Sequence, residues 1–275
     1  MSEADELEVE ISENERRRSV QSIKVGSTLL DALADSSGPL HLRELSKRAR
    51  MQPSKARRYL ISFLECGLVE QHPATGRYDL GSMALRLGFA ALSRMDPVRL
   101  SVEAASALSQ ELDRTLLVCV WSERGPIIIS WFDSSEILAC NLRVGSVLPL
   151  TLSASGKLFL THLSPKTTKP LVDRALRQAQ TERRLTAAQA KEELAQSIRE
   201  TRRDGFATSK GSLLPGLGAI AVPILDSSGA IVAAVAEIHK AGASEEVGGR
   251  LVQQRLVETA GEVSARLGYK WKAEA

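Results

Sequence analysis

The sequence contains no long hydrophobic run, since no stretch of about 18 or more apolar residues occurs. Three acidic residues stand among the first six, where a signal peptide would need basic residues followed by an apolar segment. Cysteine is scarce and forms no CxxC pair; the three cysteines are Cys66, Cys119 and Cys140. We therefore expect neither a membrane span nor secretion, but a cytoplasmic protein with reduced cysteines that pack as small hydrophobes.

Signatures of catalysis and of metal binding are also missing. Lys157 follows Gly156, but a phosphate-binding loop would need a glycine where Thr151 stands and a serine or threonine where Leu158 stands. A Ser-x-x-Lys pattern fails as well, because serines lie four and two residues before Lys157 rather than three. No GxSxG occurs, and the histidines are isolated rather than paired at ligand spacing: His41, His72, His162 and His239. We expect no enzyme activity, no cofactor and no metal.

What the chain does have is a globular composition with an uneven distribution of charge. Its 275 residues are 43% hydrophobic and 25% charged, and this length favours two domains. Residues 1–15 hold seven acids and no base, which is typical of an unfolded tail. Residues 16–96 hold 14 Lys and Arg against 7 Asp and Glu, whereas residues 97–275 hold 22 against 19. A local basic field is expected of a module that binds a polyanion such as DNA, although a solvated charged face is the alternative.

Residues 20–66 are predicted to form three short helices. The first ends at the turn-forming residues 35–39, and the second covers residues 43–49. Pro53 suits the first position of the third helix, and Gly67 suits the residue after its end. The apolar positions at helical spacing are Val25, Leu29, Ala32 and Leu33, then Leu45 and Ala49, then Ala56, Leu60, Phe63 and Leu64.

Only residues 50–52 separate the second and third helices, which is the length of a helix-turn-helix connection. Strand-like residues 68–70 and 77–80 follow around the turn-rich segment 72–76 and predict a hairpin, so the whole module is a winged helix. The third helix would lie in the major groove of DNA, and the wing would reach the backbone or the minor groove. The residues expected to contact DNA are Arg43, Ser54, Lys55, Arg57, Arg58 and Arg77. The alternative is that these arginines only solubilise a small helical bundle.

A linker helix over residues 83–94 is predicted to follow, with Leu85, Phe89 and Leu92 on one face. An amphipathic helix that joins two domains must bury its apolar stripe, and a second copy of itself or of the winged helix is the natural partner. We therefore expect a dimer, with packing of the stripe on the chain's own domains as the alternative.

The larger domain is predicted to be α+β, with a central sheet of antiparallel hairpins and interposed helices. Expected helices are 97–112, 153–162, 171–179, 187–204 and 246–267; expected strands are 116–121, 126–132, 137–142, 206–209, 217–225 and 231–238.

Several short motifs occur in a fixed order along residues 20–270. They are the segments 65–70, 75–81, 143–150, 153–157, 205–206 and 220–224. With this order the chain resembles the IclR family of bacterial transcriptional regulators. The patterns above predict a mixed α/β (α+β) fold that begins with an acidic tail (1–18), a winged helix-turn-helix (19–81) and a linker helix (82–96). The resemblance implies that residues 97–270 form a GAF-like effector-binding domain. It also implies a homodimer or a dimer of dimers on DNA.

Ser153, Ala154 and Ser155 begin a predicted helix, whose free N–H groups and positive dipole suit a carboxylate. The resemblance implies that this stretch contacts the effector, whereas the alternative is that Ser153 is an ordinary helix N-cap. The remaining effector-lining residues that the resemblance implies are Ile137, Cys140, Ser209, Ala219, Ala236 and Ile238.

The sequence departs from its relatives in this pocket. The family commonly has an acidic run where residues 209–212 stand and Ser-x-Ser where residues 236–238 stand. The loss of these polar partners favours an effector with a larger apolar body and one anionic end, such as an aromatic or branched carboxylate. The alternative is that Ile137, Ala219 and Ile238 only pack the core.

Two classes of function follow. The first is a ligand-responsive regulator of a catabolic operon, which binds double-stranded operator DNA and changes the arrangement of its winged helices when a small effector binds. RNA polymerase is a further candidate partner of such a regulator. The second is a small-molecule binding protein or enzyme whose N-terminal module mediates protein contacts. DNA binding through phosphate contacts depends on salt, which separates the two classes.

Overall fold

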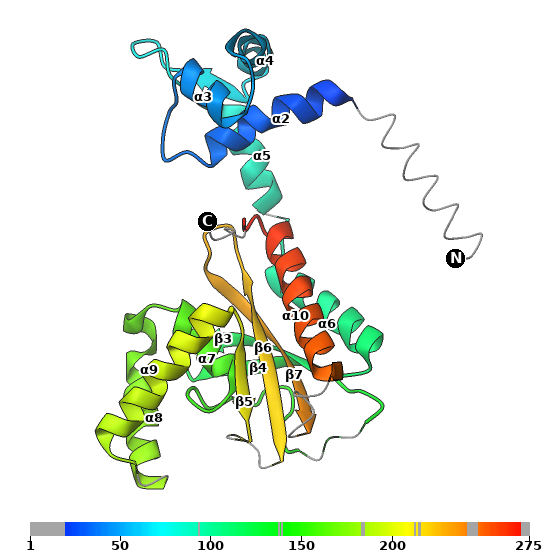
Figure 1. The fold of residues 1–275 in the computed structure, drawn as a ribbon, viewed down its shortest axis with the longest axis vertical. Coiled ribbons are helices and arrows are strands. Elements are labelled where there is room, and N and C mark those ends of the chain that lie inside the picture. Colours follow the sequence, from blue (N-terminus) through cyan, green and yellow to red (C-terminus); the bar gives the residue numbers. More distant parts are fainter. Residues whose placement is uncertain are drawn as a thin grey trace, which may run out of the picture. The chain divides into compact units, whose positions relative to one another are not determined.

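The computed structural model describes residues 20–92, 94–136, 138, 140–182, 185–211, 213, 216–240 and 247–270. The expected acidic tail lies outside these ranges. The chain divides into two compact units, Met1–Met95 and Asp96–Ala275 (Figure 1). The elements of the first unit are α2 (Gln21–Ala34), α3 (Leu42–Arg48), α4 (Pro53–Glu65), β1 (Val69–Gln71), β2 (Tyr78–Leu80) and α5 (Ser82–Leu92).

The first unit is a winged helix-turn-helix, as the sequence predicted. Helix α4 begins at Pro53, and Gly67 follows its end with a φ of +75°, which glycine adopts without strain. Strands β1 and β2 pair antiparallel. Leu40 also pairs with Tyr78: Leu40 N donates to Tyr78 O at 2.9 Å, and Tyr78 N donates to Leu40 O at 2.8 Å. Fully buried Leu29, Leu45 and Leu60 come from the three different helices and form the core that holds them together.

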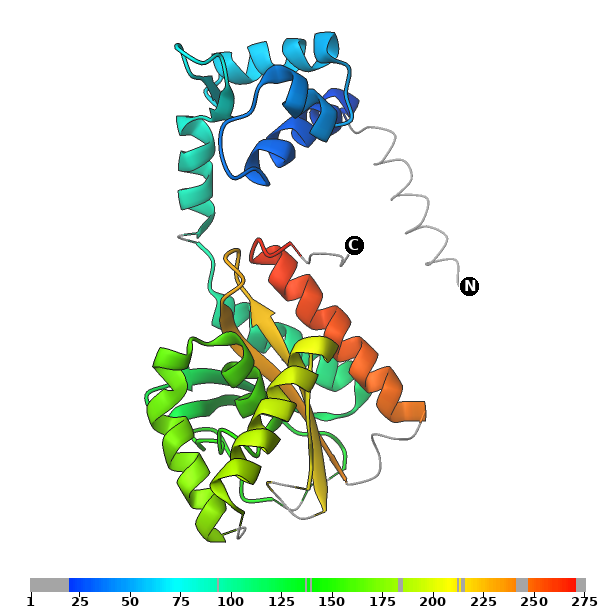
Figure 2. The same cartoon turned by 60° about the vertical axis from the view of Figure 1, so that its left-hand side comes forward.

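The second unit is an α+β domain with a five-stranded antiparallel sheet in the order β4-β3-β7-β6-β5 (Figure 2). Its strands are β3 (Thr115–Ser122), β4 (Gly125–Phe132), β5 (Ala207–Lys210), β6 (Leu217–Leu225) and β7 (Ile231–Lys240). Its helices are α6 (Pro97–Leu112), α7 (Ala154–His162), α8 (Pro165–Glu182), α9 (Ala187–Asp204) and α10 (Val247–Arg266).

Helices cover both faces of this sheet. Helices α6 and α10 pack on one face, and α7 packs on the other with α9 and α8 outside it. A separate apolar cluster therefore lies on each face: Leu116 and Val235 belong to the cluster under α6 and α10, and Leu117 and Ala236 to the cluster under α7. No helix of the described ranges has the length and apolar character needed to cross a bilayer.

The predicted strand 137–142 is wrong over its described residues, 138 and 140–142, which form a loop. The free edge of β4 bonds instead to the segment that follows. Ile128 N donates to Ser146 O at 3.0 Å, and Leu148 N donates to Pro126 O at 2.8 Å. Because this edge is taken, Leu138 packs against the cluster under α7 rather than in a strand.

Helix α8 is longer than the predicted 171–179, because it begins at Pro165 and continues through Pro170. A proline inside a helix removes a backbone hydrogen-bond donor, so Pro170 led the sequence analysis to predict that the helix begins after it. The hydroxyl of Ser164 accepts a hydrogen bond from Thr167 N at 3.2 Å and stabilises the earlier start.

Candidate functional site

Helix α4 presents its polar side chains on one exposed face. Ala56 and Leu60 are fully buried on the opposite face, so the apolar stripe fixes the orientation of the helix. The predicted DNA-contacting residues of this helix are all exposed: Ser54, Lys55, Arg57 and Arg58. Within the described ranges, the side chains of Lys55, Arg57 and Arg58 make no ion pair and no hydrogen bond. They are available to phosphate oxygens and base edges.

The other two predicted DNA contacts are Arg43 on α3 and Arg77 in the wing, and both are exposed. Arg77 Nε donates to His41 Nε2 at 3.2 Å, and His41 is the residue that precedes α3. The wing is thereby tied to the start of the helix-turn-helix. Sequence reasoning treated His41 as an isolated residue, because local patterns carry no signal for a contact across 36 positions.

The predicted dimerisation stripe of α5 is not covered within its unit. Leu85 and Phe89 are 61% and 63% exposed, and Leu87 on the same helix is 52% exposed. The side chain of Leu92, the third predicted residue, lies outside the description. Burial of large apolar side chains such as these is worth about 1.5–3 kcal/mol each, so this helix gains from a partner.

The beginning of α7 is enclosed. Ser153, Ala154 and Ser155 are only 2–3% exposed. Ser153 is an N-cap, because its Oγ accepts a hydrogen bond from Gly156 N at 3.0 Å and donates one to Pro149 O at 2.7 Å. A Cβ atom on Gly156 would lie 2.3 Å from Leu150 O, so the loop before α7 packs directly on its first turn.

Two backbone donors remain in this enclosed turn. Among the described residues, neither the N–H group of Ala154 nor that of Ser155 has an acceptor. Buried backbone N–H groups nearly always have a partner, which makes this pair a candidate anion site. Beside it, burial raises the pKa of the Cys119 thiol to about 12, and a hydrogen bond from Ser155 opposes that rise. The thiol therefore stays neutral and adds no competing negative charge.

The strands bring most of the remaining predicted effector residues together. Ser209, Ala219 and Ile238 form one cross-strand row, and Ala236 lies two residues along β7 on the same face. Three of these residues pack in the cluster under α7 that also contains Ala154: Ala219, Ala236 and Ile238. Cys140 lies half-buried in the loop after β4, and Ile137 is outside the described ranges. Apart from the polar Ser209, these strand residues form an apolar wall in the cluster that contains Ala154, and core packing accounts equally for Ala219 and Ile238.

Lys157 is a residue of this region whose role sequence reasoning missed. Its Nζ donates to Thr208 O at 2.7 Å, which ties α7 to β5. Burial lowers its pKa, and the charge of Glu200 partly opposes that effect.

Two family descriptions match the chain, and they confirm the resemblance. The IclR helix-turn-helix domain matches residues 22–73, and the C-terminal domain of the bacterial transcriptional regulator IclR matches residues 89–265. The crystal structure of Pseudomonas aeruginosa HmgR is 30% identical with a TM-score of 0.75, covering 92% of this chain and 100% of that chain.

Other relatives agree. The DNA-binding transcriptional repressor YiaJ of Escherichia coli K12 is 26% identical over 258 residues, covering 94% of this chain and 91% of that protein. An IclR homologue from Microbacterium hydrocarbonoxydans, solved in complex with 4-hydroxybenzoate, shares the fold at 18% identity with a TM-score of 0.51, covering 89% of this chain and 98% of that chain. Because the family descriptions span most of its length, the chain belongs to the IclR family of bacterial DNA-binding transcriptional regulators, with a ligand-binding domain at its C-terminal end.

Proposed function

We propose that the chain regulates a catabolic operon, with α4 reading an operator in the major groove and the second unit binding a small carboxylate effector. The observation that carries the proposal is the exposed, unpaired basic face of α4 in a helix-turn-helix. Arg57 and Arg58 supply phosphate or guanine contacts, and Arg77, held by His41, supplies a wing contact.

Selection of binding sites from random DNA by the full-length protein tests this proposal. We expect one recurrent sequence, bound at least about a thousandfold more tightly than random DNA in a gel-shift titration. Recovery of no enriched sequence would contradict a role as an operator-binding regulator.

The proposed effector site is the N-terminus of α7, where the N–H groups of Ala154 and Ser155 bind a carboxylate. The apolar row containing Ala219 and Ile238 contacts the body of the ligand. An aromatic or branched carboxylate suits this combination of two donors and an apolar wall. The IclR homologue solved with 4-hydroxybenzoate makes that compound the first ligand to try.

The variant Ala154→Leu tests this site, because a bulky side chain next to both donors should block access to them. We expect the variant to keep operator affinity and to lose the effect of the ligand on it, since a ligand that cannot bind cannot shift the equilibrium. Ser155→Ala should do far less, because it keeps both backbone donors and the helix dipole. Gel-shift titrations with and without 4-hydroxybenzoate, or the best carboxylate from a thermal-shift screen, measure both effects.

A cooperative thermal transition of the Ala154→Leu protein is the control for folding. A full ligand response in this folded variant would mean that the effector binds elsewhere in the domain.

The α5 stripe supports a homodimer, or a dimer of dimers, through contact with a second copy of the chain; RNA polymerase remains a further proposed partner. Leu85 and Phe89 are the exposed apolar residues that carry this proposal. Phe89→Glu places a charge in that contact and should give a lighter species in sedimentation at micromolar concentration. A wild-type protein that already sediments as a monomer would remove the proposal.

A further inference from the structure

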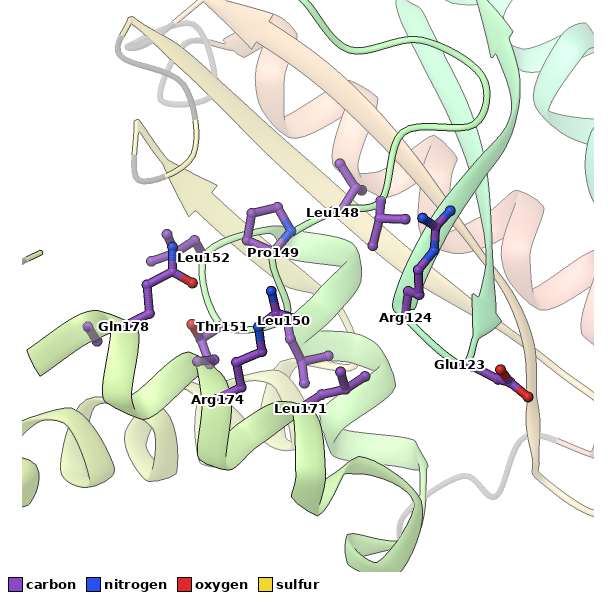
Figure 3. A pocket seen from close by; sticks show the side chains of 13 residues that line it. Glu123, Arg124, Leu148, Pro149, Leu150, Thr151, Leu152, Leu171, Arg174 and Gln178 are labelled. Atoms are coloured by element: carbon purple, nitrogen blue, oxygen red, sulfur yellow. The ribbon is translucent and has the colours of Figure 1, made fainter. Parts of the chain in front are cut away.

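A cavity of about 460 Å³ lies in the second unit, and none of Ser209, Ala219 and Ile238 lines it. It is bounded by the turn between β3 and β4, by residues 147–152 and by α8 (Figure 3). None of the residues predicted to bind DNA, effector or a second copy lines it. Its volume is within the range of small-molecule sites in proteins.

Two arginines line this cavity, Arg124 from the turn between β3 and β4 and Arg174 from α8. Figure 3 shows the side chain of Arg174 rising from α8 toward Leu150 and that of Arg124 beside Leu148, whereas Glu123 points away. Neither guanidinium makes an ion pair or a hydrogen bond with the rest of the described chain. Two unpaired guanidinium groups at one cavity suit a carboxylate, because arginine binds carboxylates with paired N–H donors.

Much of the rest of the wall is apolar, although Glu123, Thr151 and Gln178 also line it. Leu148 and Leu150 are 5% and 6% exposed, and Leu171 of α8 lies opposite them in the lining. A smaller cavity of about 150 Å³ adjoins the first, since Thr151, Leu152, Ala175 and Ala179 line both. The smaller cavity is walled mainly by aliphatic side chains of α8 and α9, with the polar side chains of Thr151, Lys157, Glu193 and Ser197 also lining it. Together the two cavities offer a ligand both apolar surface and polar groups.

The wall formed by residues 149–152 is held rigidly. Ser153 Oγ donates to Pro149 O at 2.7 Å, and the contact between Leu150 and Gly156 leaves no room for a Cβ atom. On the other side, Ser122 Oγ accepts from Arg124 N at 3.3 Å and donates to Gly125 O at 2.7 Å, which orders the turn that carries Arg124. A cavity with such fixed walls loses little freedom when a ligand enters it.

We propose that this cavity is a second ligand site, which binds an amphipathic carboxylate with an elongated aryl or alkyl body. The carboxylate binds at Arg124 and Arg174, and the apolar body packs on Leu150 and Leu171. This site is independent of the proposed effector site at the start of α7.

Isothermal titration calorimetry of the full-length protein with 4-phenylbutyrate tests the proposal. We expect saturable binding, a clearly weaker signal for the neutral analogue 4-phenylbutanol, and about tenfold weaker binding of 4-phenylbutyrate to Arg174→Gln and to Arg124→Gln. Both arginines are exposed, so neither change disturbs the core. Arg177→Gln is the matched control, because Arg177 is an exposed arginine of the same helix that lines neither cavity.

Ala154→Leu separates this site from the proposed effector site. Unchanged affinity in Ala154→Leu, together with the loss in Arg174→Gln, assigns the binding to the cavity at Arg124 and Arg174 whatever the outcome at α7. The proposal is overturned by the absence of saturable binding at millimolar concentrations, by equal affinities of Arg174→Gln and Arg177→Gln, or by loss of all binding in Ala154→Leu.

Discussion

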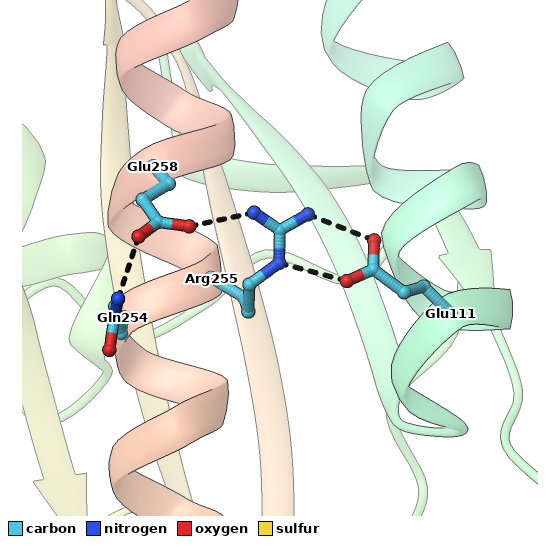
Figure 4. A network of polar contacts seen from close by, with 4 residues as sticks. All are labelled: Glu111, Gln254, Arg255 and Glu258. Carbon is cyan, nitrogen blue, oxygen red and sulfur yellow. Dashed lines mark hydrogen bonds and ion pairs between the residues drawn. The ribbon is translucent and has the colours of Figure 1, made fainter. Parts of the chain in front are cut away.

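Arginines of α4 in the first unit and of α10 in the second have different surroundings. On α4, Arg57 and Arg58 are exposed and have no ionic partner within the described ranges. On α10, Arg255 lies between two carboxylates: it donates to Glu111 of α6 at 2.8 and 3.0 Å and to Glu258 at 2.7 Å (Figure 4). These hydrogen bonds lower the pKa of Glu111, so the contact between α6 and α10 stays ionised over the ordinary range of pH. Arg255 is thus paired inside the second unit, whereas Arg57 and Arg58 have no such partner among the described residues.

The units also differ in which polar groups they offer to a partner. The winged helix presents side-chain cations on its surface, as a DNA-binding surface must. The second unit instead encloses two N–H groups, at Ala154 and Ser155, that have no acceptor among the described residues. The comparison predicts that changes to α4 act on binding to DNA, while changes to the start of α7 act first on the stability of the domain and on its ligand.

The largest expected effect comes from Gly156→Ala in the enclosed turn. The new Cβ atom would lie 2.3 Å from Leu150 O, and an overpacked core of this kind costs about 3 kcal/mol of unfolding free energy. Gly261→Ala is the matched control, because Gly261 is a helical glycine of the same unit with nothing within 4 Å, and alanine should stabilise the helix by about 1 kcal/mol. Urea unfolding of both proteins measures the difference. Equal stabilities would show that the turn is not tightly enclosed.

A smaller effect, on DNA affinity alone, is expected for Arg58→Ala. Loss of one base contact should weaken operator binding by about 1–3 kcal/mol and affect mainly one operator position. Arg99→Ala is the control, because Arg99 is an exposed arginine of the second unit that is already paired, with Glu103 at 2.6 Å. Gel-shift titrations should show a loss for the first variant and none for the second. Wild-type affinity in a folded Arg58→Ala protein would exclude Arg58 from the interface.

The smallest effect is chemical and compares two cysteines. Burial raises the pKa of Cys119 to about 12, so only about one Cys119 thiol in ten thousand is ionised at pH 8, and its contribution to reactivity appears only as the pH approaches 12. Cys66 is exposed at the end of α4. Iodoacetamide at pH 8 should therefore label Cys66 and leave Cys119 unmodified in the folded protein, as read by peptide mass spectrometry. Rapid labelling of Cys119 would contradict the enclosed environment described for α7.

Local signals predicted the fold well because they act over a few residues. Pro53 and Gly67 mark the two ends of α4, and Ser153 begins α7, each through the backbone geometry or hydrogen bond that the residue type supplies. The predicted strand over 137–142 was wrong. An apolar run cannot show that Ser146 and Leu148, which come later in the chain, make the backbone hydrogen bonds with the edge of β4. Pro170 likewise suggested a helix start that Ser164 places earlier.

The candidate sites likewise differ in whether local sequence patterns could predict them. The polar face of α4 follows from helical spacing alone, and the structure leaves its residues exposed as expected. The contact of His41 with Arg77 and that of Lys157 with Thr208 join residues 36 and 51 positions apart, so only the folded chain brings them together. The cavity at Arg124 and Arg174 had no sequence signal at all, because a turn, a loop and a helix supply its residues separately.

The salt dependence of operator binding tests the central claim most directly. Fluorescence anisotropy should show that the logarithm of the binding constant falls linearly with the logarithm of salt concentration, with a slope of about −0.9 for each phosphate contacted. Lys55→Gln should reduce the magnitude of that slope by about one while the selected sequence stays the same. A slope near zero for the wild-type protein would contradict the account, because the unpaired cations of α4 would then not be meeting phosphates.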